Sequence, residues 1–204
     1  MRLAIVDLEM AQPNNEIVEI GACLWDCRNP SQQGRGQQFH SYVKPLTYDS
    51  LPEDLGPCNK INKSVAELTG ITKSFLVNAP SPDVALTQFW QWLEELKCGN
   101  RLGAWGAGDV PALVRDSKAA GVEAPRNLKE INLKWIGVLA RSAYPKSCKA
   151  QGGLDSTMAL LGLQFEGKPH RALDDAVNTG RVLQRAWDML NKYMLMERLV
   201  NGPK

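Results

Sequence analysis

The sequence lacks several features that would assign its class at once. It has no apolar run approaching the roughly 20 residues of a membrane span. Its first apolar stretch is too short and is followed too soon by acidic residues to be a secretory signal peptide. The 5 cysteines are odd in number and form no C-x-x-C pair, so neither a disulfide framework nor a zinc site is indicated. We therefore expect a cytoplasmic protein with reduced thiols and no membrane association.

Strong charge of either sign is also missing. The formal net charge of +2 permits nucleic-acid binding, but a dedicated binder usually has a much larger basic excess. Linkers, repeats and low-complexity segments are absent from the 204 residues, of which 44% are hydrophobic. We expect one domain over residues 1–204, with its core at about residues 3–193 and a frayed C-terminal tail.

The opening segment, residues 3–9, has the most informative pattern. Four consecutive apolar residues predict a strand buried on both faces. Asp7 and Glu9 then follow at a spacing of two, which places both carboxylates on the same face of a strand. Carboxylate oxygens are suitable ligands for Mg²⁺ or Mn²⁺, and a cation would offset the cost of burying two charges. The alternative is a strand end in solvent, with both acids hydrated.

The remaining pattern predicts an α/β domain in which an antiparallel meander precedes β-α-β units. Residues 46–63 are expected to be irregular. The expected strands lie at residues 17–25, 39–43, 101–105 and 128–133, and the expected helices at residues 64–68, 81–97, 110–120, 154–161 and 171–193, with one more ending near residue 143.

The last expected helix contains two neighbouring aspartates with different orientations. A helical wheel places Asp174 in the polar face with Arg181 and Arg185, and Asp175 beside the apolar stripe. We therefore expect Asp174 to be solvated and Asp175 to point toward the sheet. The alternative is that both acids only complement the positive end of the helix dipole. The apolar stripe is expected to contain Ala176, Val182, Leu183, Ala186, Trp187 and Leu190.

Two further residues are candidates for chemistry. His170 follows a Gly/Pro loop just before this helix, and histidine is the side chain best suited to accept a proton near neutral pH. The alternative is an ordinary loop histidine, and His40, within an expected strand, is assigned a structural or exposed role. Asp109 follows a glycine-rich turn at the carboxyl end of an expected inner strand, where open α/β sheets place their sites. Its alternative role is to cap the following helix.

These three segments together resemble a known family. Asp7-x-Glu9, Trp105-x-x-x-Asp109 and His170-x-x-x-x-Asp175 are similar, in order and spacing, to the three Exo motifs of the DEDDh 3′→5′ exonucleases, within the RNase T/proofreading-exonuclease superfamily. Residues 39–45 and 68–72 most resemble the branch of the histone-mRNA 3′-exonuclease and its bacterial relatives. The resemblance implies a ribonuclease H-like fold, with a mixed five-stranded sheet flanked by helices.

The resemblance also implies a reaction and its cofactors. Asp7, Glu9 and Asp175 would hold one Mg²⁺ or Mn²⁺, with Asp7 bridging to a second ion that Asp109 supports. His170 would be the general base. The expected substrate is the 3′ end of single-stranded RNA or DNA, and the expected products are nucleoside 5′-monophosphates.

Substrate contacts are implied in the same way. The backbone of Leu8 to Ala11 and the loop at Thr69 to Ile71 would hold the terminal nucleotide, although relatives often have threonine or a small residue where this chain has Met10. The expected substrate-binding residues are Leu8, Met10, Ala11, Thr69, Gly70, Ile71, Trp105, Lys168 and Arg171, with Lys146 and Lys149 as further candidates for phosphate contacts.

Three other functions are considered. An oligoribonuclease-like enzyme acting on very short RNAs competes within the favoured class. A catalytically silent nucleic-acid-binding module of the same fold could lose its carboxylates, yet all of them are present. A small-molecule nucleotide-binding domain is disfavoured because the glycine fingerprint is absent. The sequence leaves open the choice between RNA and DNA, the oligomeric state and any partner protein.

Overall fold

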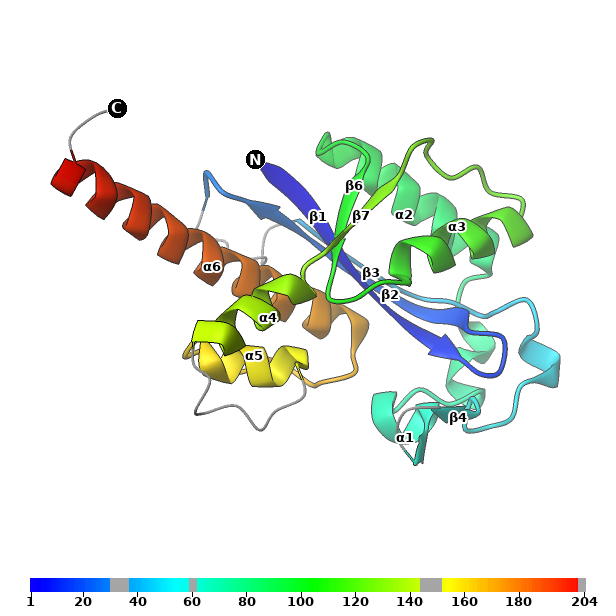
Figure 1. Ribbon diagram of the computed structural model, residues 1–204. Helices are drawn as coiled ribbons and strands as arrows, with labels where there is room; N and C mark the ends of the chain where they lie inside the picture. The colour runs from blue at the N-terminus through cyan, green and yellow to red at the C-terminus, as the bar shows by residue number, and fades with distance from the viewer. Residues whose placement is uncertain (30–36, 59–61, 144–151, 202–204) are drawn as a thin grey trace.

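The computed structural model describes residues 1–29, 37–58, 62–143 and 152–201. Its main sheet has five strands in the order β3-β2-β1-β6-β7 (Figure 1). The β1–β2 and β2–β3 pairs are antiparallel, whereas the β1–β6 and β6–β7 pairs are parallel. The expected mixed five-stranded sheet is therefore confirmed. Its strands are β1 (Arg2–Ala11), β2 (Glu16–Asp26), β3 (Gln38–Tyr42), β6 (Arg101–Ala104) and β7 (Lys129–Asn132).

Helices cover both faces of this sheet. In Figure 1, α2 and α3 lie on one side of β1, and α4, α5 and α6 lie on the other. A second, two-stranded sheet and α1 lie beside the end of β1 and the start of β2. The elements outside the main sheet are η2 (Tyr48–Ser50), β4 (Pro57–Cys58), β5 (Lys63–Ser64), α1 (Val65–Thr69), η3 (Ser74–Asn78), α2 (Pro82–Leu96), α3 (Asp109–Ala119), α4 (Lys134–Ala143), α5 (Leu154–Leu160) and α6 (Ala172–Asn201).

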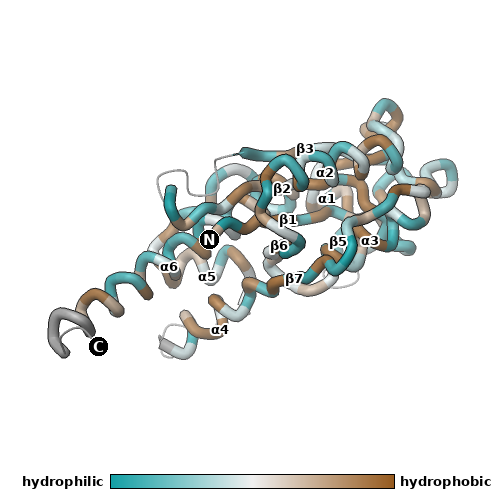
Figure 2. The backbone as a smooth tube through the Cα atoms, turned by 90° about the horizontal axis from the view of Figure 1, so that it is seen from above, coloured by the Kyte–Doolittle hydropathy of each residue, from teal (hydrophilic) through white to brown (hydrophobic). Residues whose placement is uncertain are grey.

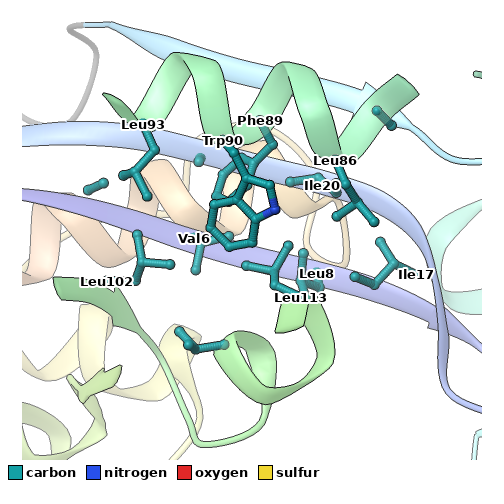
Figure 3. Packing of buried hydrophobic residues seen from close by; sticks show 14 of the residues in the cluster. Val6, Leu8, Ile17, Ile20, Leu86, Phe89, Trp90, Leu93, Leu102 and Leu113 are labelled. Atoms are coloured by element: carbon teal, nitrogen blue, oxygen red, sulfur yellow. The ribbon is translucent and has the colours of Figure 1, made fainter. Parts of the chain in front are cut away.

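The side chains of β1 divide between two cores. Ala4, Val6 and Leu8 pack with α2 and α3, in the cluster that Figure 3 shows. Leu3 and Ile5 pack with α4, α5 and α6. This division follows from the period of two along a strand. The next odd-numbered residues, Asp7 and Glu9, therefore face α6, whereas Ala11, after a shift in register, packs in a third cluster.

The last helix differs from its expected length and orientation. α6 continues past its expected end at Tyr193 to Asn201, because no glycine or proline lies between these two residues. Its C-terminal half extends away from the sheet (Figures 1 and 2), and Leu190 is 50% exposed rather than packed. Arg181, expected on the polar face, is buried because the segment after α5 covers it. Its Nη1 atom donates to the Gln164 carbonyl and to Asn178 Oδ1.

Other differences are small. Residues 46–63, expected to be irregular, contain η2 and the short strands β4 and β5. The helix at residues 64–68 is confirmed as α1, with Ser64 as its cap and Gly70 in the left-handed conformation after its end.

Within the described ranges, no helix combines the length and hydropathy that crossing a membrane requires. Cys23, Cys27, Cys58 and Cys98 are free thiols, and Cys148 lies outside the described residues.

The first turn of α6 lies directly on β2, and this contact generates a prediction. A Cβ atom at Gly21 would overlap the backbone of Ala172 and Leu173. Gly21→Ala should therefore lower the free energy of unfolding by about 1–3 kcal/mol, because the helix must move away from the strand. Gly106→Ala is the control, since its Cβ would meet nothing within 4 Å. Urea denaturation measures both variants, and an unchanged stability of Gly21→Ala would contradict this packing.

Candidate active site

Two acids of the site come from β1. Asp7 and Glu9 continue the row of odd-numbered residues that faces α6. The β1–β2 register then shifts: Glu9 lies opposite Glu19, whereas Met10 lies opposite Ile17. Such a bulge is common beside active sites, because it redirects the strand end without breaking the sheet. The two carboxylates are thus held on the central strand of the sheet.

The start of α6 brings a third acid and a histidine to these residues. One ligand atom each of Glu9, His170 and Asp175 lie within 4.8 Å of one another. The backbone N–H of His170 donates to Asp175 Oδ2 at 2.9 Å. His170 has φ of 61°, a left-handed conformation that a residue other than glycine adopts only when its surroundings hold it there.

Asp174 and Asp175 have different positions, as the helical wheel predicts. Asp175 faces Glu9, whereas the Asp174 carboxylate accepts the backbone N–H of Lys168 at 2.9 Å. Asp174 is half-buried rather than fully solvated, because Gly167 packs against its carboxylate. The two acids together fix the segment that precedes α6.

Asp109 does not cap α3, so the alternative role considered for it is wrong. Gly108 occupies the N-cap position and Asp109 is the first helical residue. The Glu130 carboxylate, from β7, accepts the backbone N–H of Val110 at 3.0 Å and that of Gly108 at 3.3 Å. The carboxylate of Asp109 is left to interact with that of Asp7.

The carboxyl groups of the site have raised pKa values. Burial, followed by the charges of Asp109 and Asp175, raises the pKa of Asp7 well above its ordinary value. Burial, with Asp175 next in effect, raises the pKa of Glu9 to about 8. Burial raises the pKa of Asp109 to about 7, with a further contribution from Glu130. Burial also raises the pKa of Asp175 to about 7, although the His170 N–H opposes the shift.

This arrangement is suited to a divalent cation. Several carboxylates in one place repel each other in their charged forms, and a cation removes that repulsion. The oxygen atoms of Glu9 and Asp175 and a nitrogen of His170 are close enough to share one ion. Carboxylate oxygen is the ligand that Mg²⁺ and Mn²⁺ prefer. The donor set therefore fits the expected cofactor.

Sequence reasoning gave no role to Glu19, which is 0% exposed and lies beside the site. Burial alone would raise its pKa, but hydrogen bonds from His40 and the Ala172 N–H, together with the Arg171 charge, lower it. His40 thus has a partner: its Nε2 atom lies 2.7 Å from Glu19 Oε1. The feature of the sequence that could have indicated a role for Glu19 is its place as an acidic residue inside an otherwise apolar strand.

The residues expected to bind substrate form three groups: buried positions, half-buried apolar side chains and basic side chains. Leu8, Ala11, Thr69 and Ile71 have buried side chains, and Gly70 has none, so these positions can offer only backbone groups. The half-buried side chains of Met10 and Trp105 pack against the two main cores.

The basic candidates already have partners inside the protein. Lys168 Nζ donates to the Thr69 carbonyl at 3.4 Å, which links the segment before α6 to the last residue of α1. The Arg171 guanidinium contacts Glu19 and Tyr42. Lys146 and Lys149 lie outside the described residues.

The fold and the acidic site define a class, the ribonuclease H-like exonucleases, and the comparisons agree. The exonuclease family model RNase_T matches residues 4–183, and the chain belongs to this family. It is 28% identical to ERI1 exoribonuclease 2 of Danio rerio over 197 residues, 87% of this chain and 32% of that protein. The chain thus spans about a third of the length of this relative.

Solved structures share the fold. One, of the 3′-end specific recognition of histone mRNA stem-loop by 3′-exonuclease, has a TM-score of 0.69 and 20% identity, covering 92% of this chain and 82% of that one. The nuclease domain of 3′hExo, a DEDDh family member, bound to rAMP, has a TM-score of 0.66 and 21% identity, with 92% of each chain covered. The resemblance expected from the sequence is confirmed.

The raised pKa values predict how stability depends on pH. In EDTA, the free energy of unfolding should fall as the pH rises from about 5.5 to about 8.5, because the folded state holds protons that the unfolded acids, with pKa values near 4, have already lost. The stabilisation is complete when the pH is below the pKa values that these acids have in the unfolded chain. It is lost as the pH passes about 7 for Asp109 and Asp175 and about 8 for Glu9.

Urea denaturation at several pH values in this range measures the effect. The carboxyl groups with lowered pKa values stay ionised throughout the range, so they do not contribute to the change. Added Mn²⁺ should remove most of the decline, since the cation replaces the protons as the neutralising charge. A stability that increases with pH in EDTA would contradict the electrostatic description of the site.

Proposed function

We propose that this chain is a metal-dependent 3′→5′ exonuclease that releases nucleoside 5′-monophosphates from the 3′ end of single-stranded RNA or DNA. The observation that supports it is the meeting of Glu9, His170 and Asp175 beside the carboxylates of Asp7 and Asp109. The family match over residues 4–183 supports the same reaction class. The names of the relatives, an exoribonuclease and an exonuclease of histone mRNA, favour RNA as the first substrate to test.

The proposed cofactors are two Mg²⁺ or Mn²⁺ ions. We assign Asp7, Glu9 and Asp175 to one ion, and Asp7 with Asp109 to the other. Two such ions would activate a water molecule and stabilise the departing 3′ oxygen. The identity and number of the ions follow from the family resemblance and from the oxygen-rich donor set.

We propose His170 as the general base. Its ring lies close to Glu9 and Asp175 and is exposed to solvent, so it can take a proton from the attacking water and pass it to bulk solvent. The bond from its backbone N–H to Asp175 holds the residue beside that carboxylate. Asp175 would thus act both as a ligand and as the residue that orients the base.

The proposed nucleotide site uses the backbone of Leu8 to Ala11 and of Thr69 to Ile71, on one domain with its core at residues 3–193. Trp105 and Lys168 stay predictions as substrate contacts, whereas the bonds of Arg171 to Glu19 and Tyr42 favour a different role for Arg171. A cytoplasmic location, expected from the cysteine pattern, also stays a proposal.

Asp7→Asn tests the proposed reaction. The wild-type chain should shorten 3′-labelled single-stranded RNA in Mg²⁺ or Mn²⁺, release mononucleotides, and stop when EDTA is added. Asp7→Asn should lower kcat by at least about 10²-fold, because it removes a charge proposed to bridge both ions. DNA of the same sequence and RNAs of two to five nucleotides separate a general exonuclease from an oligoribonuclease-like enzyme.

Folding of this variant is checked by thermal denaturation in EDTA. Asp7→Asn should be at least as stable as the wild type near pH 8, because it removes a buried repulsion. Nucleic-acid binding without any metal-dependent release would favour the silent module, and near-normal release by Asp7→Asn would remove Asp7 from its proposed role.

Asp174 and Asp175 form a matched pair for a second test. Asparagine at either position keeps an oxygen that can accept the loop N–H, from Lys168 or from His170, so each variant mainly loses charge. Asp175→Asn should lower kcat by about 10²-fold or more, whereas Asp174→Asn should stay within about threefold of the wild type. Steady-state kinetics on one RNA measures both, and a reversed order would assign the metal to Asp174.

A further inference from the structure

Glu19 is a buried acid that the proposed reaction does not use. It is 0% exposed and lies opposite Glu9 in the β1–β2 register, on the sheet face that α6 covers. A buried carboxylate is costly unless donors surround it, so its partners indicate its role.

Most of these partners come from the start of α6. Arg171 Nε and Nη2 donate to Glu19 Oε1 at 3.2 and 3.1 Å, and the Ala172 N–H donates to Oε2 at 3.2 Å. His40, from β3, approaches Oε1 at 2.7 Å. The carboxylate therefore joins β2 and β3 to the first residues of the helix.

Arg171 is held on its other side as well. Its guanidinium donates to the Tyr42 hydroxyl and lies 5.4 Å from the centre of the Tyr42 ring. The Glu19 and Tyr42 positions are neighbours in the β2–β3 register. The guanidinium is thus bonded to side chains of two adjacent strands, although the Arg171 side chain is 29% exposed.

The segment anchored in this way contains the proposed base. His170 precedes Arg171 and has a left-handed backbone, which persists only where surrounding contacts over-determine it. Gly21, two residues after Glu19 and on the same face, lets the helix approach the strand to backbone contact. Gly21 therefore determines how closely the first turn of α6 approaches β2. The Glu19–Arg171 pair fixes the position of that turn along the sheet.

We propose that Glu19 and Arg171 form a positioning pair that holds the first turn of α6 so that His170 and Asp175 meet Glu9. The role deepens the proposed exonuclease function and rests on it. In this role the Arg171 guanidinium stays on Glu19 and is not used to bind substrate phosphate.

Glu19→Gln tests the pair, with Asp116→Asn as a matched control. Asp116 is also a buried carboxylate, 9% exposed, that accepts from a backbone N–H and an arginine: Ile17 N at 2.9 Å and Arg115 Nε at 2.7 Å. In EDTA and without substrate, amide hydrogen exchange at residues 170–176 should accelerate by at least about tenfold in Glu19→Gln and stay unchanged in Asp116→Asn.

Kinetics supplies the second measurement. In Mg²⁺, Glu19→Gln should lower kcat by at least about tenfold with KM for a short RNA unchanged, because the catalytic groups are misplaced while the nucleotide site is intact. Arg171→Met should show the same exchange and the same loss of kcat. The double variant should lose no more than either single variant, since both changes break one interaction.

Each contrary result has a distinct meaning. Wild-type exchange at residues 170–176 in Glu19→Gln overturns the positioning role, and so does a rise in KM at constant kcat in Arg171→Met, which would return Arg171 to phosphate binding. If Glu19→Gln does not fold, Arg171→Met decides alone, because it leaves Glu19 bonded to His40 and the Ala172 N–H. Absence of nucleotide release by the wild type defeats the proposed function, whereas the exchange experiment needs no activity.

Discussion

Repulsion among the carboxylates of Asp7, Glu9, Asp109 and Asp175 is the constraint on which the rest of the structure depends. Such groups separate unless the backbone that bears them is rigid. Each lies at the end of an element anchored in one of the main cores: β1 at the centre of the sheet, α3 on one face and α6 on the other. The hydrophobic cores therefore provide the energy that keeps the acids together.

Local patterns were sufficient to predict much of this arrangement. The spacing of Asp7 and Glu9 gave their common face, because the period of a strand does not depend on distant residues. The helical wheel distinguished Asp175 from Asp174 for a similar reason, since the first turns of α6 pack on the sheet along a continuous stripe. The antiparallel meander and the parallel strands after it were expected from the short connections between the first strands and from the β-α-β pattern that succeeds them.

Features that join distant segments could not be predicted in this way. The carboxylate that accepts N–H groups at the start of α3 belongs to Glu130 on β7, so a pattern around Asp109 could not reveal it. Arg181 lies on the polar side of α6 in sequence, yet the segment after α5 folds over that side and buries it. Glu19 and Arg171 are separated by 152 positions, and only the packing of α6 on β2 brings them together. Each case depends on which surfaces meet, and the local sequence does not specify that.

The raised pKa values of the site have a consequence for its occupancy. Near neutral pH, the carboxyl groups with pKa values of about 7 and about 8 hold protons part of the time. A cation that binds there must displace them, so protons and metal compete for the same oxygen atoms and apparent affinity rises steeply with alkalinity. The same acidic groups that would hold a divalent cation therefore also make its binding weaker at low pH than at high pH.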